Sequence, residues 1–404
     1  MTAVLMRSGY HLDNESLGLV LGLMGLGIAI SELPWGLLTD RWGDRPVLLL
    51  GLASTALALI VMALVAAPTP GHVPGLGWLG AGLLLVGLLG GSVNGASGRA
   101  VMIWFADGER GLAMSIRQTA VPLGGGLGAL LLPMVALHAG FAALYALLAA
   151  LCALGALPAW AWVHEPPGRS QGEYRSRGRR FSNEPRAQPA AQAAATAPRQ
   201  GPLRDPQVWR IVAGIGILCA PQFAVLSFGT VFLHDFGHAG LAAITATMVA
   251  VQVGAIAMRV WSGRWTDRRR NRPAYLRACS AIGVLLFAGL GVASLAKLGA
   301  DSPAGQALLM LLMAASGICI SAWHGVAYTE LAVRAGAARA GTALGMANTS
   351  VFAVCFFTPL AIPHLQGLQG WPLVWFAASG CALLALPLLA PAQEVRGQPR
   401  AQPL

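Results

Sequence analysis

Apolar residues fill long, nearly unbroken runs along this chain, with short polar stretches between them. Eleven of these runs approach or exceed the ~20 residues that a helix needs to cross the hydrocarbon core of a bilayer. Pro46 and Pro273 stand where new helices would begin, and "PTPGHVPG" at 68–75 connects two runs. A β-barrel would show short alternating segments instead. The pattern therefore predicts an all-α polytopic membrane protein with spans at 17–38, 46–66, 76–105, 112–136, 139–163, 207–233, 241–264, 274–298, 304–332, 341–363 and 371–391.

Composition agrees with a membrane protein. The 404 residues are 56% hydrophobic and 11% charged, with a mean hydropathy of +0.63, which is more apolar surface than a soluble core would bury. The net charge of +11 does not indicate nucleic acid, because the arginines lie in short strips between apolar runs without interleaved aromatic residues. The six cysteines are scattered singly and are expected to be core residues. We expect no metal and no cofactor.

The arginines also indicate which side of the membrane each connection faces. The connections after odd-numbered spans, with the C-terminal tail, contain 19 arginines, whereas the connections on the other side contain only Arg7. By the positive-inside rule the arginine-rich side is cytoplasmic. The residues before position 17 would then lie outside with no apolar segment to carry them there. We therefore expect a twelve-helix ancestor whose first span is mostly missing, for which "MTAVLM" would be the last turn; the alternative is a true eleven-helix protein with a translocated tail.

Two polar stretches of the chain have similar amino-acid sequences. "GLLTDRWGDRP" from Gly36 and "GRWTDRRRNRP" from Gly263 match at an offset of 227, and "ERGLAMS" at 109–115 echoes "ARAGTALG" at 338–345 at a similar offset. Two matches at nearly one offset indicate an internal duplication in parallel orientation. We expect an N-terminal bundle at 1–163, a largely disordered cytoplasmic linker at 164–206, a six-helix C-terminal bundle at 207–392 and a cytoplasmic tail at 393–404.

The first of these stretches resembles the signature loop of the major facilitator superfamily, and its second copy resembles the weaker repeat of that loop. The glycine-rich "PLGGGLGALLLP" and the central linker extend the resemblance to nearly the whole chain. It implies a fold of two pseudo-symmetric helical bundles with twelve spans in the family. Asp44 departs from the basic residue usual in the family. The positions that correspond to the signature and its echo are Gly36, Asp40, Arg41, Gly43 and Arg45, and Gly263, Asp267, Arg268 and Arg272.

The signature loop also has a physical rationale. A glycine at a helix end lets another helix approach closely, and a carboxylate is stabilised by the unpaired amides at a helix N-terminus. We expect Asp40 to face the start of the helix at 341, and Asp267 the start of the helix at 112, so that each aspartate latches one half to the other. The alternative is that these charges only fix membrane topology.

Ionisable side chains within the spans cost at least ~2.5–3.5 kcal/mol each, so each requires a role. Those toward the cytoplasmic half would form an inner gate of ion pairs, or the arginines would snorkel to the headgroups. Direct solute contact is a third role, in which three arginines against two glutamates favour an anion. The charged candidates are Glu32, Arg99, Arg117, Arg259 and Glu330, and the uncharged ones are Asn94, Gln118, Gln222, Gln252, Trp323 and His324, of which His324 could carry a proton.

The resemblance implies a secondary transporter that moves a small organic solute, such as an anion or an exported drug-like compound, by alternating access. No nucleotide-binding motif is present, so an ion gradient, with the proton as one candidate, or the solute's own gradient would drive it. We expect a monomer in the lipid bilayer, and the resemblance to bacterial members of the family implies the bacterial inner (plasma) membrane. A non-transporting sensor on the same scaffold is the alternative, and an enzyme is not expected because no catalytic motif occurs within the helices.

Overall fold

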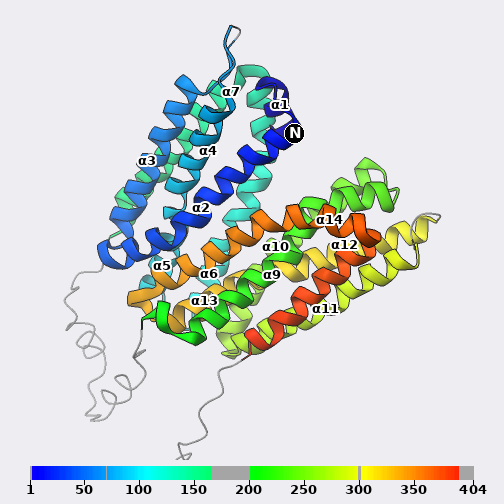
Figure 1. Cartoon of the computed structure of the whole chain (residues 1–404). Coiled ribbons are helices and arrows are strands. Elements are labelled where there is room, and N and C mark those ends of the chain that lie inside the picture. The colour runs from blue at the N-terminus through cyan, green and yellow to red at the C-terminus, as the bar shows by residue number, and fades with distance from the viewer. Residues whose placement is uncertain (1, 70, 165–200, 299–301, 391–404) are drawn as a thin grey trace, which may run out of the picture. The chain divides into compact units, whose positions relative to one another are not determined.

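The chain is mostly α-helical in the computed structural model, which describes residues 2–69, 71–164, 201–298 and 302–390 (Figure 1). No strand occurs in these ranges. The predicted all-α fold class is therefore confirmed. Most of the predicted linker and the whole predicted tail lie outside the described residues.

The first part of the chain, up to residue 164, begins with a short helix and continues with long apolar helices. Asp13 caps α2 by accepting a hydrogen bond from the Ser16 amide at 2.8 Å, and this bond lowers the pKa of the Asp13 carboxyl. The helices are α1 (Thr2–Gly9), α2 (Asn14–Trp42), α3 (Asp44–Val65), α4 (Leu76–Gly90), α5 (Ser92–Trp104), α6 (Arg110–Gln118) and α7 (Ala120–Trp162).

The second part, from residue 201, repeats this pattern. A π-helical turn, η4 (Phe232–Phe236), extends the end of α9. The elements are η3 (Pro202–Arg204), α9 (Pro206–Val231), η4, α10 (Leu241–Arg269), α11 (Arg272–Leu295), α12 (Pro303–Ser321), α13 (His324–Ala335), η5 (Ala337–Arg339) and α14 (Ala340–Leu388).

Nine stretches of the described residues are long and apolar enough to cross a membrane. Two of them, Arg110–Trp162 and Ala337–Leu388, have 53 and 52 residues, more than twice the length of one crossing. Each is interrupted at a glycine in a left-handed conformation, Gly140 (φ 77°) in α7 and Gly370 (φ 71°) in α14, where two helices meet. Divided at these glycines, the described residues contain the eleven crossings that the sequence predicts.

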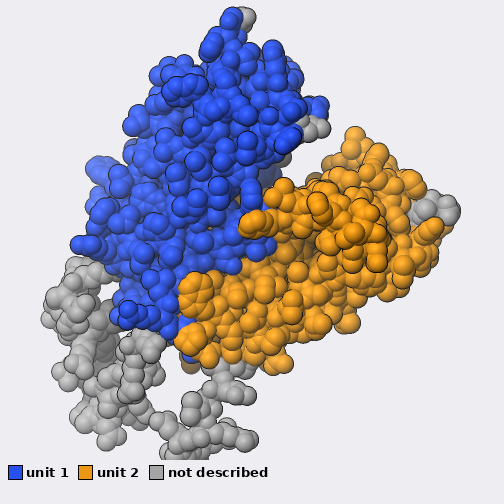
Figure 2. Space-filling view, in the orientation of Figure 1, with its two compact units in different colours: residues 1–106, 123–205, 331–356 blue, residues 107–122, 206–330, 357–404 orange. Residues whose placement is uncertain are grey.

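The chain forms two compact units, coloured separately in Figure 2. Unit 1 comprises residues 1–106, 123–205 and 331–356, and unit 2 comprises residues 107–122, 206–330 and 357–404. The segments 107–122 and 331–356 thus each belong to the unit built mainly from the other half of the chain. The division of the chain at the linker stays a prediction.

Each unit has its own aromatic core. In unit 1 the Tyr10 hydroxyl donates to the Ala66 carbonyl at 2.7 Å and lies 2.9 Å from the Tyr145 hydroxyl, with the ring of Phe141 packed edge-on against Tyr10. In unit 2 the fully buried Phe232 packs edge-on against Trp375 at 5.0 Å between ring centroids.

Candidate functional site

Asp40 lies at the end of α2 and caps the start of α14 within unit 1. Its carboxylate accepts hydrogen bonds from the Gly341 amide at 2.9 Å, from the Thr342 amide at 2.7 Å and from the Thr342 hydroxyl at 2.5 Å. Amides in the first turn of a helix have no intrahelical partner, and the helix dipole favours negative charge there. We call this arrangement the Asp40 cap.

Arg99 of α5 joins the Asp40 cap to the start of α3. Its side chain is 1% exposed, with Nε 3.3 Å from Asp40 Oδ1 and Nη1 2.5 Å from Asp44 Oδ1. A buried guanidinium is tolerated when acids compensate its charge. Asp44, the residue that departs from the family's usual basic one, therefore shares a buried cation with Asp40.

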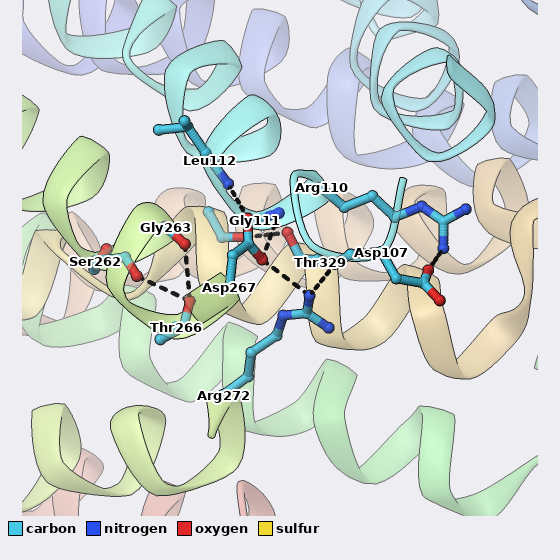
Figure 3. A network of polar contacts seen from close by, with 11 residues as sticks. Asp107, Arg110, Gly111, Leu112, Ser262, Gly263, Thr266, Asp267, Arg272 and Thr329 are labelled. Carbon is cyan, nitrogen blue, oxygen red and sulfur yellow. Dashed lines mark hydrogen bonds and ion pairs between the residues drawn. The ribbon is translucent and has the colours of Figure 1, made fainter. Parts of the chain in front are cut away.

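Asp267 of α10 caps the start of α6 in unit 2 in the same way (Figure 3). Its carboxylate accepts hydrogen bonds from the Gly111 amide at 3.0 Å and from the Leu112 amide at 2.8 Å. Glu109, which precedes α6, makes no side-chain cap of its own. Arg272 lies 3.0 Å from Asp267 and donates to the Asp107 carbonyl. We call this arrangement the Asp267 cap.

Glycines bring the backbones together at both caps. A methyl group at Gly36 would clash with the Gly341 carbonyl, and one at Gly345 would lie 2.6 Å from the Glu32 carbonyl oxygen. In unit 2 a methyl group at Gly263 would lie 2.5 Å from the Gly111 carbonyl oxygen. Helices can approach this closely only where the side chains are small.

Glu32 lies two turns before Asp40 on α2 and is fully buried. Its carboxylate accepts hydrogen bonds from the Asn94 side chain and from the Asn348 side chain, the latter at 3.1 Å. It also lies beside Gly91, which precedes the first residue of α5. A carboxylate near a helix N-terminus is electrostatically favourable.

Arg259 occupies the corresponding place on α10 and is 3% exposed. Its Nη1 donates to the Gln118 carbonyl at 2.6 Å and its Nε to the Ser321 carbonyl at 2.9 Å. Both carbonyls belong to the last residue of a helix, α6 and α12 respectively, where the dipole favours a cation. Pro122 has no amide hydrogen, so the Gln118 carbonyl lacks the partner that a continuous helix would supply.

The repeat relates Glu32 to Arg259, because both precede their signature glycine by four residues. The residues they meet, Asn348 and Gln118, are also separated by a nearly equal offset, 230. The two copies of the repeat thus have opposite charges at equivalent positions. The first copy has the acid Glu32 near the start of α5, and the second has the base Arg259 at the end of α12. The sequence motifs do not single out Asn348 or Thr342, although both lie at an offset of 230 from residues of the opposite copy, Gln118 and Leu112.

The two intramembrane arginines described above do not snorkel, since both are buried. Arg99 pairs with Asp40 and Asp44, and Arg259 donates to the Gln118 and Ser321 carbonyls. The inner gate of ion pairs stays a prediction. Arg117 approaches the Met114 sulfur at 3.9 Å.

The remaining candidates include the stacked pair Trp323 and His324, which lies against Arg259. The His324 ring stacks on Trp323 at 3.9 Å between centroids, with Nδ1 3.4 Å from Arg259 Nη2. Gln222 is buried in α9 and Gln252 is half-buried in α10. Arg45 donates to the Trp160 carbonyl at 2.8 Å. The described residues contain no group of three or more potential ligands placed to hold a metal ion.

These features define a polytopic membrane transport protein with a duplicated architecture and a capped helix start in each copy. The chain belongs to the major facilitator superfamily, because its residues 1–359 match that family, described as "Major Facilitator Superfamily". The sequence-based resemblance is thereby confirmed, and the chain is a multi-pass secondary transporter of this family.

Proteins similar in sequence are also named as transporters. The chain is 30% identical over 393 residues to "Uncharacterized MFS-type transporter Rv2994" of Mycobacterium tuberculosis (strain ATCC 25618 / H37Rv), covering 94% of this chain and 79% of the relative. It is 29% identical over 136 residues to "Uncharacterized transporter YybO" of Bacillus subtilis (strain 168), covering 34% and 29% of the two chains.

Solved structures share the fold. The transporter FucP in the outward conformation superposes with a TM-score of 0.67 at 15% identity, covering 95% of this chain and 92% of FucP. The proton:xylose symporter XylE bound to 6-bromo-6-deoxy-D-glucose gives a TM-score of 0.69 at 16% identity, covering 96% and 90%. At such identities the likeness concerns the fold alone.

Proposed function

We propose that this transporter moves a small organic solute across the bacterial plasma membrane by alternating access, with Asp40 and Asp267 as latches of the predicted cytoplasmic side. In this architecture one half rocks against the other around a central site. A latch must therefore hold strongly in one state and release in the other.

The observation that carries the proposal is the pair of repeat-related caps. Each aspartate accepts hydrogen bonds from two backbone amides at the start of a helix that is distant in sequence. A hydrogen bond to a charged group contributes about 1.5–3 kcal/mol net, so each cap contributes a few kcal/mol. The free-energy difference between two conformations of a protein is also a few kcal/mol. Loss of one cap is therefore enough to shift the populations of the two conformations.

The charge count does not select an anionic solute. Three intramembrane arginines against two glutamates favoured an anion, but Arg99 is already compensated by Asp40 and Asp44. Arg259 lies at two helix C-termini, whose partial negative charges offset much of its own. The proposal is therefore limited to a small organic solute.

The test begins with purified protein in proteoliposomes and a solute panel measured with and without a proton gradient. Asp40→Asn and Asp267→Asn are then compared with the wild type on the solute that accumulates. Asparagine keeps the size but loses the charge that the amides bind, so we expect transport to fall several-fold while membrane insertion is retained.

Asp13→Asn is the matched control, because asparagine caps a helix as well as aspartate does and Asp13 lies outside both caps. Its transport should equal that of the wild type. Wild-type transport in both cap variants would contradict the latch. A solute that stabilises the protein against heating but is never moved would instead support a non-transporting sensor.

A further inference from the structure

Exposed arginines crowd the end of α10 and the start of α11 in unit 2. Arg264, Arg268, Arg269, Arg270 and Arg277 are all exposed, and we call them the arginine patch. The acid within this segment, Asp267, does not neutralise them, because its side chain is 3% exposed and is bound to the amides of α6. The patch therefore presents a concentrated positive charge.

Two tryptophans place part of this patch at the membrane surface. Trp261, Arg264, Trp265 and Arg268 follow the spacing i, i+3, i+4 and i+7, so they share one face of α10. The two indoles stack at 5.7 Å between centroids, and Trp261 is 50% exposed. Exposed tryptophans of membrane helices are enriched at headgroup level. The guanidinium groups on the same stripe then lie among the lipid phosphates, to which arginine binds in a bidentate manner.

The first copy of the repeat shows that membrane topology does not require this patch. At the offset of 227, the equivalents of the five arginines are Leu37, Arg41, Trp42, Gly43 and Leu50. The first copy keeps one arginine where the second has five. Because both loops are predicted to face the cytoplasm, the four additional charges need another explanation.

Arg270, a member of the patch, allows backbone strain and lipid binding to be tested separately. It adopts a left-handed backbone conformation, with φ 50° and ψ 37°, and its equivalent in the first copy is Gly43, with φ 94°. Glycine tolerates positive φ without steric cost, whereas arginine does not.

We propose that the arginine patch binds the headgroup phosphate of an anionic phospholipid in the predicted cytoplasmic leaflet. Clusters of arginines at that surface attract anionic lipids, and the attraction is electrostatic. Phosphatidylglycerol is the probe that we choose. This site is separate from solute transport and stands even if the proposed function fails.

The test measures thermal unfolding of the full-length protein in a neutral detergent while phosphatidylglycerol or phosphatidylcholine with the same acyl chains is added. We expect only phosphatidylglycerol to raise the unfolding temperature, and less so as salt increases. Arg264→Gln/Arg268→Gln should raise the half-saturating phosphatidylglycerol concentration by roughly tenfold or more.

The matched control is Arg41→Gln/Arg204→Gln, which removes two exposed arginines from unit 1 and should leave that concentration unchanged. An equal shift in both double variants would show diffuse charge attraction and overturn the site. Stabilisation by inorganic phosphate as strong as that by the lipid would also overturn it, since the ligand would then be a free anion.

Arg270→Gly separates backbone strain from binding. Glycine should raise the unfolding temperature without lipid, because it relieves the left-handed conformation, and should weaken the response to phosphatidylglycerol. These two effects have opposite directions, so a general loss of stability cannot imitate them. An unchanged lipid response would contradict the role given to Arg270.

Discussion

At the scale of single residues, the buried Arg99 forms ion pairs with both Asp40 and Asp44. Arg99→Met would leave Asp40 and Asp44 without their buried cation, which costs about 3–5 kcal/mol in comparable cases. We expect a large fall in the thermal unfolding temperature in detergent. Adding Asp44→Asn should recover part of that loss, because one buried acid is removed. A variant as stable as the wild type would contradict the ion pairs.

The glycines of the same region give a second prediction. Gly345→Ala places a methyl group against the Glu32 carbonyl, so α14 must move away from α2, at a cost of about 1–3 kcal/mol. Gly25→Ala, on α2, is the control, since a methyl group there meets no atom within 4 Å. It should stabilise the helix by roughly 0.5–1 kcal/mol. Unfolding temperatures that changed alike in both variants would refute the close approach.

At the scale of elements, Arg259 holds the ends of two helices. Arg259→Met should cost about 1–3 kcal/mol for each buried carbonyl that loses its donor, those of Gln118 and Ser321. Pro122→Ala restores an amide hydrogen that can serve the Gln118 carbonyl.

The combination of both changes provides the check. We expect the double variant to lose less stability than the two single changes predict together, measured as a thermodynamic cycle. Strict additivity would show that the proline and the arginine do not act on the same carbonyl.

The elements themselves could be predicted from the sequence because the apolar runs are long and nearly all arginines of the connections fall on one side of the predicted membrane. The interruption at Gly370 falls between two predicted spans, and the one at Gly140 falls at the second residue of the predicted span 139–163. The predicted number of crossings is therefore correct even though the helices are nearly continuous. The interruptions at Gly91 and at Ala322 were not predicted, because each lies inside one apolar run. Asp40 and Asp267 could be placed from charge and helix polarity, whereas Arg99 and Asn348 depend on which faces pack together.

At the scale of the whole molecule, the parallel repeat predicts which residues share a membrane face. Asp107→Cys and Arg269→Cys should react with an impermeant maleimide from the cytoplasmic face, and His72→Cys and His234→Cys from the other. All four positions are exposed. The unmodified protein, with its six cysteines, gives the background. Labelling of positions 107 and 269 from opposite faces would refute the parallel duplication.

Main-chain amides supply two donors to each aspartate cap, and this has an evolutionary consequence. Residues 112 and 342 can change to any amino acid except proline without removing an amide. Substitutions at position 112 therefore need no compensating change at Asp267, and those at position 342 remove only the hydroxyl donor of the Asp40 cap. Methods that infer contacts from correlated substitutions among related sequences would register little here, even though the contact joins distant parts of the chain.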